Sequence, residues 1–195
     1  MLRAEDERDR SYIQLYDRLV GDTKLGGRTI LDVGCGWGGG CAYVANYFEP
    51  RLVVGLDLVE SNITACRANG HTSRQTFLVG NATDLPFASA SFDVVMNVES
   101  SHNYKSFPHF VREVWRVLAP GGTLLFADLR PTENAWARTL EMLKDAGFAV
   151  GATEDVTAGI LDAMARQAGA KNALLAAPRF EGMDRASLAE IMLCP

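Results

Sequence analysis

The stretch Thr29-Ile30-Leu31-Asp32-Val33-Gly34-Cys35-Gly36-Trp37-Gly38-Gly39-Gly40 decides the fold of this chain. Its β-branched and apolar start is typical of a strand buried in a parallel sheet. Five glycines follow within seven residues, and residues 41–45 then resume at helical spacing. A strand, a glycine turn and a helix form a unit that binds nucleotide-like ligands, because glycines allow close backbone approach and a helix start offers free N–H groups.

Asp32 indicates which nucleotide-like ligand this unit binds. The spacing Gly34-x-Gly36-x-x-Gly39 also fits the dinucleotide fingerprint. A carboxylate just before the turn repels a pyrophosphate, whereas it attracts an ammonium or sulfonium group. The pattern therefore favours S-adenosylmethionine over NAD, with a purely structural glycine turn as the third interpretation.

A second acidic residue supports a nucleoside ligand. Residues 52–56 predict another buried strand, and Asp57 stands at its carboxyl end, 21 residues beyond Gly36. An acidic residue about 20 positions beyond the glycines is where a ribose diol is hydrogen-bonded. The alternative is a carboxylate that only begins the next helix.

The remaining pattern alternates strands with helices and predicts an α/β fold: a Rossmann-like sheet, mostly parallel, with helices on both faces. The further strands are expected at 76–79, 92–96, 123–127 and 148–150, and a seventh near 191–193 is uncertain. The expected helices are 6–20, 41–48, 61–69, 106–118, 132–146 and, with breaks, 157–193. We expect a single domain over 1–195, made of an N-terminal helix (1–28), a donor-binding core (29–148) and a helical acceptor-side cap (149–195).

Composition narrows the partners. With 19 basic and 24 acidic residues, the net charge of −5 gives no broad footprint for nucleic acid. The sequence has no apolar run near the roughly 20 residues of a membrane span, and its charged start lacks a signal-peptide core, so we expect a cytoplasmic protein. Its four cysteines lack metal-ligand spacing and predict reduced thiols. An exposed edge of the sixth strand favours a homodimer.

Five motifs in register resemble the class I S-adenosylmethionine-dependent methyltransferases over residues 28–148. They are Leu31-Asp32-Val33-Gly34-Cys35-Gly36-Trp37-Gly38, Gly55-Leu56-Asp57, Gly80-Asn81-Ala82 with Leu85-Pro86-Phe87, Ser91-Phe92-Asp93-Val94-Val95, and Val117-Leu118-Ala119-Pro120-Gly121-Gly122. The resemblance implies S-adenosyl-L-methionine as methyl donor and S-adenosyl-L-homocysteine as product. Family members usually carry Asp where this chain has Asn81, which keeps an acceptor oxygen for the adenine amino group.

The resemblance also implies a donor-binding set, each member with its own role. The set is Gly34 and Gly36 under the methionine portion, Asp32 at its amino group, Asp57 at the ribose, Leu58 on the adenine face, Asn81 and Ala82 at the adenine edge, and Asn97 and Val98 beside the methionine side chain. Within the family, residues 97–104 resemble small-molecule O-methyltransferases of the phthiotriol and glycopeptidolipid type, which act on lipid or polyketide hydroxyls.

His102 is the candidate general base. A hydroxyl that attacks a sulfonium methyl group must lose a proton, and histidine titrates near working pH. His102 follows the fourth strand, and Asp128, at the end of the fifth, is placed to orient its imidazole; the resemblance supports this pair. No second oxygen ligand follows Asp128, so we expect no metal. The acceptor is expected to be small and hydrophobic in character, and the alternatives are a sterol- or quinone-type C-methyltransferase and a non-catalytic donor-binding protein.

Overall fold

The computed structural model describes residues 10–68, 72–163 and 165. The chain divides into two compact units, residues 1–150 and 151–195. The first unit contains every element discussed below. In the second, residues 157–163 are helical, and the rest of the helical pattern expected over 157–193 lies outside the described residues except for 165.

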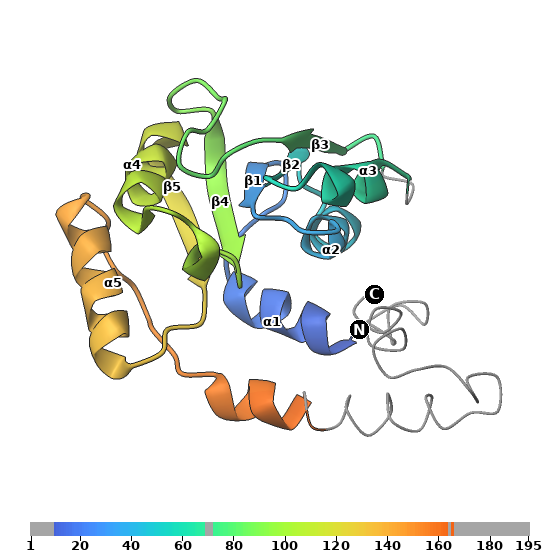
Figure 1. Cartoon of the computed structure of the whole chain (residues 1–195). Coiled ribbons are helices and arrows are strands. Elements are labelled where there is room, and N and C mark those ends of the chain that lie inside the picture. Colours follow the sequence, from blue (N-terminus) through green and yellow to red (C-terminus); the bar gives the residue numbers. More distant parts are fainter. Residues whose placement is uncertain (1–9, 69–71, 164, 166–195) are drawn as a thin grey trace. The chain divides into compact units, whose positions relative to one another are not determined.

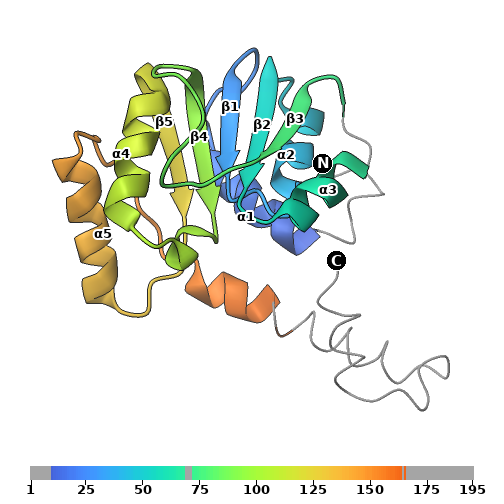
Figure 2. The same ribbon diagram turned by 45° about the horizontal axis from the view of Figure 1, so that its top comes forward.

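Five parallel strands form the sheet of the first unit, in the order β3-β2-β1-β4-β5 (Figures 1 and 2). They are β1 (Thr29–Val33), β2 (Leu52–Asp57), β3 (Gln75–Val79), β4 (Phe92–Val98) and β5 (Leu118–Ala127). The chain moves outward from β1 to β3 and then returns to β4 on the other side of β1. In such sheets the ligand binds beyond the carboxyl ends of the strands at this reversal, so the fold directs attention to the ends of β1 and β4.

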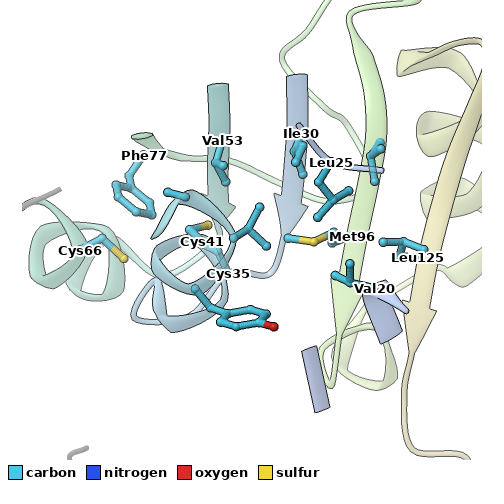
Figure 3. Packing of buried hydrophobic residues seen from close by; sticks show 14 of the residues in the cluster. Val20, Leu25, Ile30, Cys35, Cys41, Val53, Cys66, Phe77, Met96 and Leu125 are labelled. Carbon is cyan, nitrogen blue, oxygen red and sulfur yellow. The ribbon is translucent and has the colours of Figure 1, made fainter. Parts of the chain in front are cut away.

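Helices cover both faces of the sheet, as predicted. The helices α1 (Arg10–Val20), α2 (Gly39–Tyr47) and α3 (Glu60–Ala68) contribute to one hydrophobic cluster with the strands (Figure 3). The helix α4 (Phe107–Val117) packs on the opposite face, and α5 (Glu133–Asp145) adds Leu143 to the same cluster. Each cluster therefore lies on one side of a sheet whose central strands are buried on both faces.

Strand alternation on β1 sets the direction of Asp32. Ile30 belongs to the cluster beneath α1, α2 and α3, whereas Leu31 and Val33 belong to the cluster beneath α4. Successive side chains of a strand point to opposite faces, so Asp32 shares the face of Ile30. Its carboxylate lies under α2, in contact with the Cys41 thiol.

The helix ends agree with their local sequence. Ser106 and Thr132 accept hydrogen bonds from backbone N–H groups in the first turns of α4 and α5. At the end of α5, Gly147 has φ 104°, its N–H donates to Lys144 O, and the N–H of Phe148 donates to Leu143 O. This pair of bonds is a Schellman motif, in which glycine supplies the left-handed residue.

Three expectations need correction. The fourth strand continues to Val98, so Asn97 and Val98 lie in β4 rather than beyond it. Residues 119–122, between the helix expected at 106–118 and the strand expected at 123–127, lie inside β5 as an irregularity: Leu118 pairs with Phe92, and pairing resumes with Thr123 opposite Val94. Residues 148–150 form no strand.

In place of the strand predicted at 148–150, Phe148 contacts a helix. Its ring packs edge-on against Trp115 of α4, with centroids 4.9 Å apart. The homodimer expectation loses that basis. Residues 191–193 lie outside the described residues. In the described part of the chain, no helix is both long enough and apolar enough to cross a membrane.

Candidate functional site

The glycine turn at the end of β1 has the conformation that its sequence predicts. Gly34, Gly36 and Gly38 have φ of 74°, 54° and 83°, which side-chain-bearing residues rarely adopt. The N–H groups of Gly34 and Cys35 donate to Leu56 O at 2.7 and 3.1 Å, which fixes the turn to β2.

Two of these glycines have contrasting surroundings. A Cβ atom at Gly34 would lie 2.8 Å from the hydroxyl of Tyr104 and closer still to Ser100, whereas one at Gly36 would meet no atom of the described structure within 4 Å. Gly34 is therefore required for packing inside the protein. Gly36 instead borders open space, as expected where a ligand passes over the turn.

Asp32 is completely buried beside this turn. Its Oδ2 accepts from the Cys41 thiol at 3.4 Å, and its Oδ1 has no hydrogen-bond partner among the described residues. Burial raises the pKa of Asp32 to about 7, and the neighbouring Cys41 and Tyr16 only partly oppose this effect. A buried carboxylate with a free oxygen is costly in free energy, so a cation bound nearby would relieve that cost.

Asp57 holds the glycine turn and the start of α3 together. Its Oδ2 accepts from Gly36 N at 2.9 Å, and its Oδ1 accepts from Val59 N at 2.9 Å and from Asn62 Nδ2 at 3.2 Å. A carboxylate offers about four acceptor positions, so these three donors leave one for a hydroxyl. Asp57 therefore does accept hydrogen bonds at the start of α3, as the alternative interpretation expected. The remaining acceptor position keeps this role compatible with binding a ribose hydroxyl.

Leu58, Asn81 and Ala82 are the residues predicted to bind an adenine ring. Leu58 is 69% exposed, a large fraction for an apolar side chain, and Ala82 is buried. Asn81 Oδ1 already accepts from both Thr83 N and Thr83 Oγ1 at 2.9 Å. The oxygen assigned to the adenine amino group is thus engaged, and the Asn81 amide retains its N–H donors. The Asn-x-Thr spacing is typical of an Asx turn, in which an asparagine side chain accepts from the backbone two residues on, so the sequence could have predicted the contact with Thr83.

Asn97 links β1 and β4 at the reversal of strand order. It is fully buried; its Nδ2 donates to Val33 O at 2.8 Å and lies 2.8 Å from both Ser100 Oγ and Tyr104 Oη. Its Oδ1 has no partner in the described residues. Val98, the next residue, is buried as well. Tyr104 is thus a member of a polar network at this end of the sheet.

His102 and Asp128 come together as predicted. His102 lies in the 3₁₀ turn η2 (Ser101–Asn103), and its Nδ1 is 2.5 Å from Asp128 Oδ1. The His102 side chain is 34% exposed, while that of Asp128 is completely buried. No hydrogen bond in the described structure involves His102 Nε2, so this nitrogen is the one left for a substrate.

Two residues that the sequence analysis did not single out complete this pair. Ser101 Oγ donates to Asp128 Oδ2, and Arg130 Nη1 lies 3.3 Å from the same oxygen. Burial by itself would raise the pKa of Asp128, but the bonds from Ser101 and His102 and the charge of Arg130 outweigh burial and lower it. No sequence motif marks Ser101 or Arg130, because their role depends on the meeting of η2 with β5. Among the described residues, no group of three or more His, Cys, Asp or Glu side chains is arranged to hold a metal ion.

Comparison with known proteins identifies the family of this site. Residues 31–126 match the family model described as a methyltransferase domain. Over 133 residues the chain is 46% identical to the phthiotriol/phenolphthiotriol dimycocerosates methyltransferase of Mycobacterium leprae, covering 68% of this chain and 49% of that protein. The chain belongs to the class I S-adenosylmethionine-dependent methyltransferases. Over 141 residues the chain is also 44% identical to a fatty-acid O-methyltransferase of Mycolicibacterium smegmatis, covering 71% of the chain and 52% of the relative.

The methyltransferase chain spans about half the length of these curated relatives. Its fold also resembles that of the Haemonchus contortus phosphoethanolamine N-methyltransferase 2, solved with S-adenosyl-L-methionine, with a TM-score of 0.74 and 21% identity. That match covers 95% of this chain and 46% of the other, and it bears on the fold alone.

The site's chemistry fits a cationic nucleoside donor. The buried Asp32 carboxylate has an oxygen without a partner among the described residues, and the open space over Gly36 adjoins the Asp57 carboxylate. The first suits an ammonium group and the second suits a ribose hydroxyl. A pyrophosphate beside the Asp32 carboxylate would be repelled, which is the electrostatic reason that the motif differs from a dinucleotide site.

Proposed function

We propose that this protein transfers a methyl group from S-adenosyl-L-methionine to a hydroxyl oxygen of a small or lipid-like molecule. The proposal is carried by the His102–Asp128 pair at the carboxyl edge of the sheet, with Nδ1 bonded to the carboxylate and Nε2 left without a hydrogen bond in the described structure. The names of the two mycobacterial relatives support a lipid-like acceptor.

The donor-binding residues in this proposal are those at the ends of the first four strands. Asp32 and Asn97, each with a buried oxygen that no described residue contacts by a hydrogen bond, would hold the donor's amino group. Asp57 would accept from the ribose. The remaining contacts divide between the two ends of the donor: the backbone of Ala82, the Asn81 amide and the exposed Leu58 side chain would bind adenine, and Gly34, Gly36 and Val98 would line the methionine portion.

Bound S-adenosyl-L-methionine supplies a sulfonium methyl group that is already activated for displacement. The protein must align the acceptor oxygen and remove its proton. In this proposal His102 Nε2 takes the proton as the oxygen–methyl bond forms and the sulfur–methyl bond breaks. Asp128 holds the imidazole by Nδ1 and stabilises its protonated form, as carboxylates do in comparable pairs.

Two classes of acceptor test the base. An alcohol must lose its proton during attack, whereas a fatty-acid carboxylate is already ionised at neutral pH. We expect His102→Ala to lower turnover of a long-chain alcohol or diol by about 10²- to 10⁴-fold. Turnover of a carboxylate acceptor, if the enzyme accepts one, should fall by less than about tenfold because no proton transfer is needed.

The measurement uses methyl-labelled donor with both acceptor types, together with calorimetric titration of S-adenosyl-L-homocysteine. His109→Ala is the matched control, because His109 is an exposed histidine whose ring bonds to Ser106, the cap of its own helix. Unchanged alcohol turnover in His102→Ala, with normal product binding, would remove His102 as the base. Product binding by the wild type without turnover of any acceptor would favour a non-catalytic donor-binding protein.

A further inference from the structure

Arg130 has a guanidinium that is engaged at all three of its nitrogens. Its Nε donates to Thr139 Oγ1 at 2.9 Å, its Nη1 to Leu129 O at 2.8 Å and its Nη2 to Ser101 Oγ at 2.9 Å. Its Nη1 also lies 3.3 Å from Asp128 Oδ2, and the Arg130 side chain is only 12% exposed. These contacts join α5, the segment after β5 and the turn that carries His102.

Two aromatic rings also contact this guanidinium. Its carbon lies 5.0 Å from the centre of the Phe107 ring and 5.5 Å from that of Phe126, within the range of cation–π attraction. Thr139, the partner of Nε, is itself buried and donates to Ala135 O at 3.0 Å. The arginine is therefore held on several sides, and its planar group has little freedom to turn away from Asp128.

The proton acceptor of the proposed reaction needs this arrangement for an electrostatic reason. A bare carboxylate 2.5 Å from an imidazole strongly favours the imidazolium form, and an imidazolium cannot accept a proton from a substrate. A fixed positive charge on the other carboxylate oxygen offsets part of that effect. Asp128 then orients the ring while leaving it able to work as a base.

We propose that Arg130 is a positioning residue that holds Asp128 toward His102 and balances its negative charge, so that His102 can serve as the base. This inference rests on the proposed function, in which His102 accepts the substrate proton. Ser101 is part of the same device, because its hydroxyl accepts from Arg130 and donates to Asp128. The direct contact and the bridge through Ser101 both end on Asp128 Oδ2, whereas Oδ1 faces His102 Nδ1 and also accepts from Leu129 N at 2.7 Å.

Other titratable groups near the pair do not supply the balancing charge. Glu99 is acidic, and burial followed by the charge of Asp128 raises its pKa. Burial raises the pKa of Tyr104 as well, so it stays neutral at ordinary pH. Arg130 is therefore the cation that the described structure places against this carboxylate.

An NMR titration tests the inference without an acceptor. The His102 ring resonances of the full chain are followed against pH in wild type and in two neutral replacements of different shape, Arg130→Met and Arg130→Gln. We expect the imidazole to titrate about one pH unit higher in both variants than in wild type. Arg130→Lys, which keeps the charge but loses the fork, should shift by less than half of that amount.

The controls separate this inference from the proposed function. Arg112→Met removes an equal charge from an exposed site on α4 and should leave the His102 titration unchanged. An unshifted titration, within about 0.2 units, in either folded neutral variant would overturn the role of Arg130. With an acceptor in hand, the pH of half-maximal turnover should rise by the same amount while product affinity stays normal. If the His102 titration shifts in the Arg130 variants but the wild-type protein transfers no methyl group, the proposed function is refuted while the role of Arg130 stands.

Discussion

Replacing Asp32 by Asn gives a direct test of the buried charge beneath the glycine turn. The pKa of this carboxyl is raised from 3.8 to about 7 because it is buried. The folded state therefore holds the Asp32 proton between these two pH values, whereas the unfolded state has already released it. By linkage, the contribution of Asp32 to stability is fully present below pH 3.8 and is lost as the pH rises toward 7.

The size of the effect follows from the shift. Relative to a fully protonated protein, the raised pKa costs the folded state about 4 kcal/mol at pH 8, where the carboxyl is ionised, and about 1.5 kcal/mol at pH 5, where it must retain its proton. The asparagine side chain carries no charge, although its buried amide adds a cost of about 1–3 kcal/mol that does not vary with pH. The free energy of unfolding of Asp32→Asn minus that of wild type should therefore increase by about 3 kcal/mol from pH 5 to pH 8.

Urea denaturation of both proteins across this pH range measures that difference. Asp93→Asn is a control of opposite sign, because a bond from Thr29 N, together with the charge of Arg28, lowers the pKa of Asp93. The stability that Asp93 contributes is present above its unfolded pKa and is lost in acid. Asp93→Asn should therefore have a lower free energy of unfolding than wild type at neutral pH. A flat Asp32→Asn difference curve between pH 5 and pH 8 would refute the assignment of a raised pKa.

The same charge predicts how the proposed donor binds. If the bound state requires ionised Asp32, the affinity for S-adenosyl-L-homocysteine should be about tenfold higher at pH 8 than at pH 6, because proton release costs binding below pH 7. Asp32→Asn should bind more weakly and lose this pH dependence. Isothermal titration calorimetry at pH 6 and pH 8 measures these affinities. Equal wild-type affinities at the two pH values would contradict the requirement for ionised Asp32.

Three further substitutions address the turn, the adenine edge and the loop that follows it. Gly36→Ala should weaken product binding by more than about tenfold in calorimetry while costing only about 1 kcal/mol of stability, since φ is positive but no atom of the described structure obstructs the new methyl group. Asn81→Asp should strengthen product binding by about three- to tenfold, because it replaces the unengaged amide nitrogen by a charged oxygen that can accept from the adenine amino group; weaker binding would indicate that the Asn81 amide donates to adenine instead. Glu113→Gln should lower the free energy of unfolding by about 1–2 kcal/mol, since Glu113 Oε2 accepts from Leu85 N at 2.7 Å and pairs with Arg116; an unchanged urea midpoint would contradict this reasoning.

Much of the fold could be predicted from local patterns. The strand predicted at the start of the glycine motif is β1, and the caps Ser106 and Gly147 lie where serine and glycine are favoured at helix ends. The strand predicted at 148–150 failed, because a short apolar run has no feature that separates sheet pairing from packing on a helix. In the structure, Phe148 packs against Trp115 of α4 instead.

The candidate site divides in the same way. The meeting of His102 with Asp128 was predictable, because the carboxyl ends of neighbouring parallel strands share one edge of the sheet. The roles of Ser101 and Arg130 were not, since each depends on the distance between particular side-chain atoms in the folded chain.

The sequence by itself determined the alternation of strands and helices, the glycine turn and the acidic residues at the strand ends, because each follows from the residue types along a short segment. Only the tertiary structure decided the state of those acids. The packing of α2 over β1 buries Asp32 and raises its pKa, while Arg130 and Ser101 gather on Asp128 and lower its pKa. The pKa of an aspartate is thus raised at position 32 and lowered at position 128. The direction of the shift depends on the groups and the solvent around the carboxyl rather than on its neighbours in sequence.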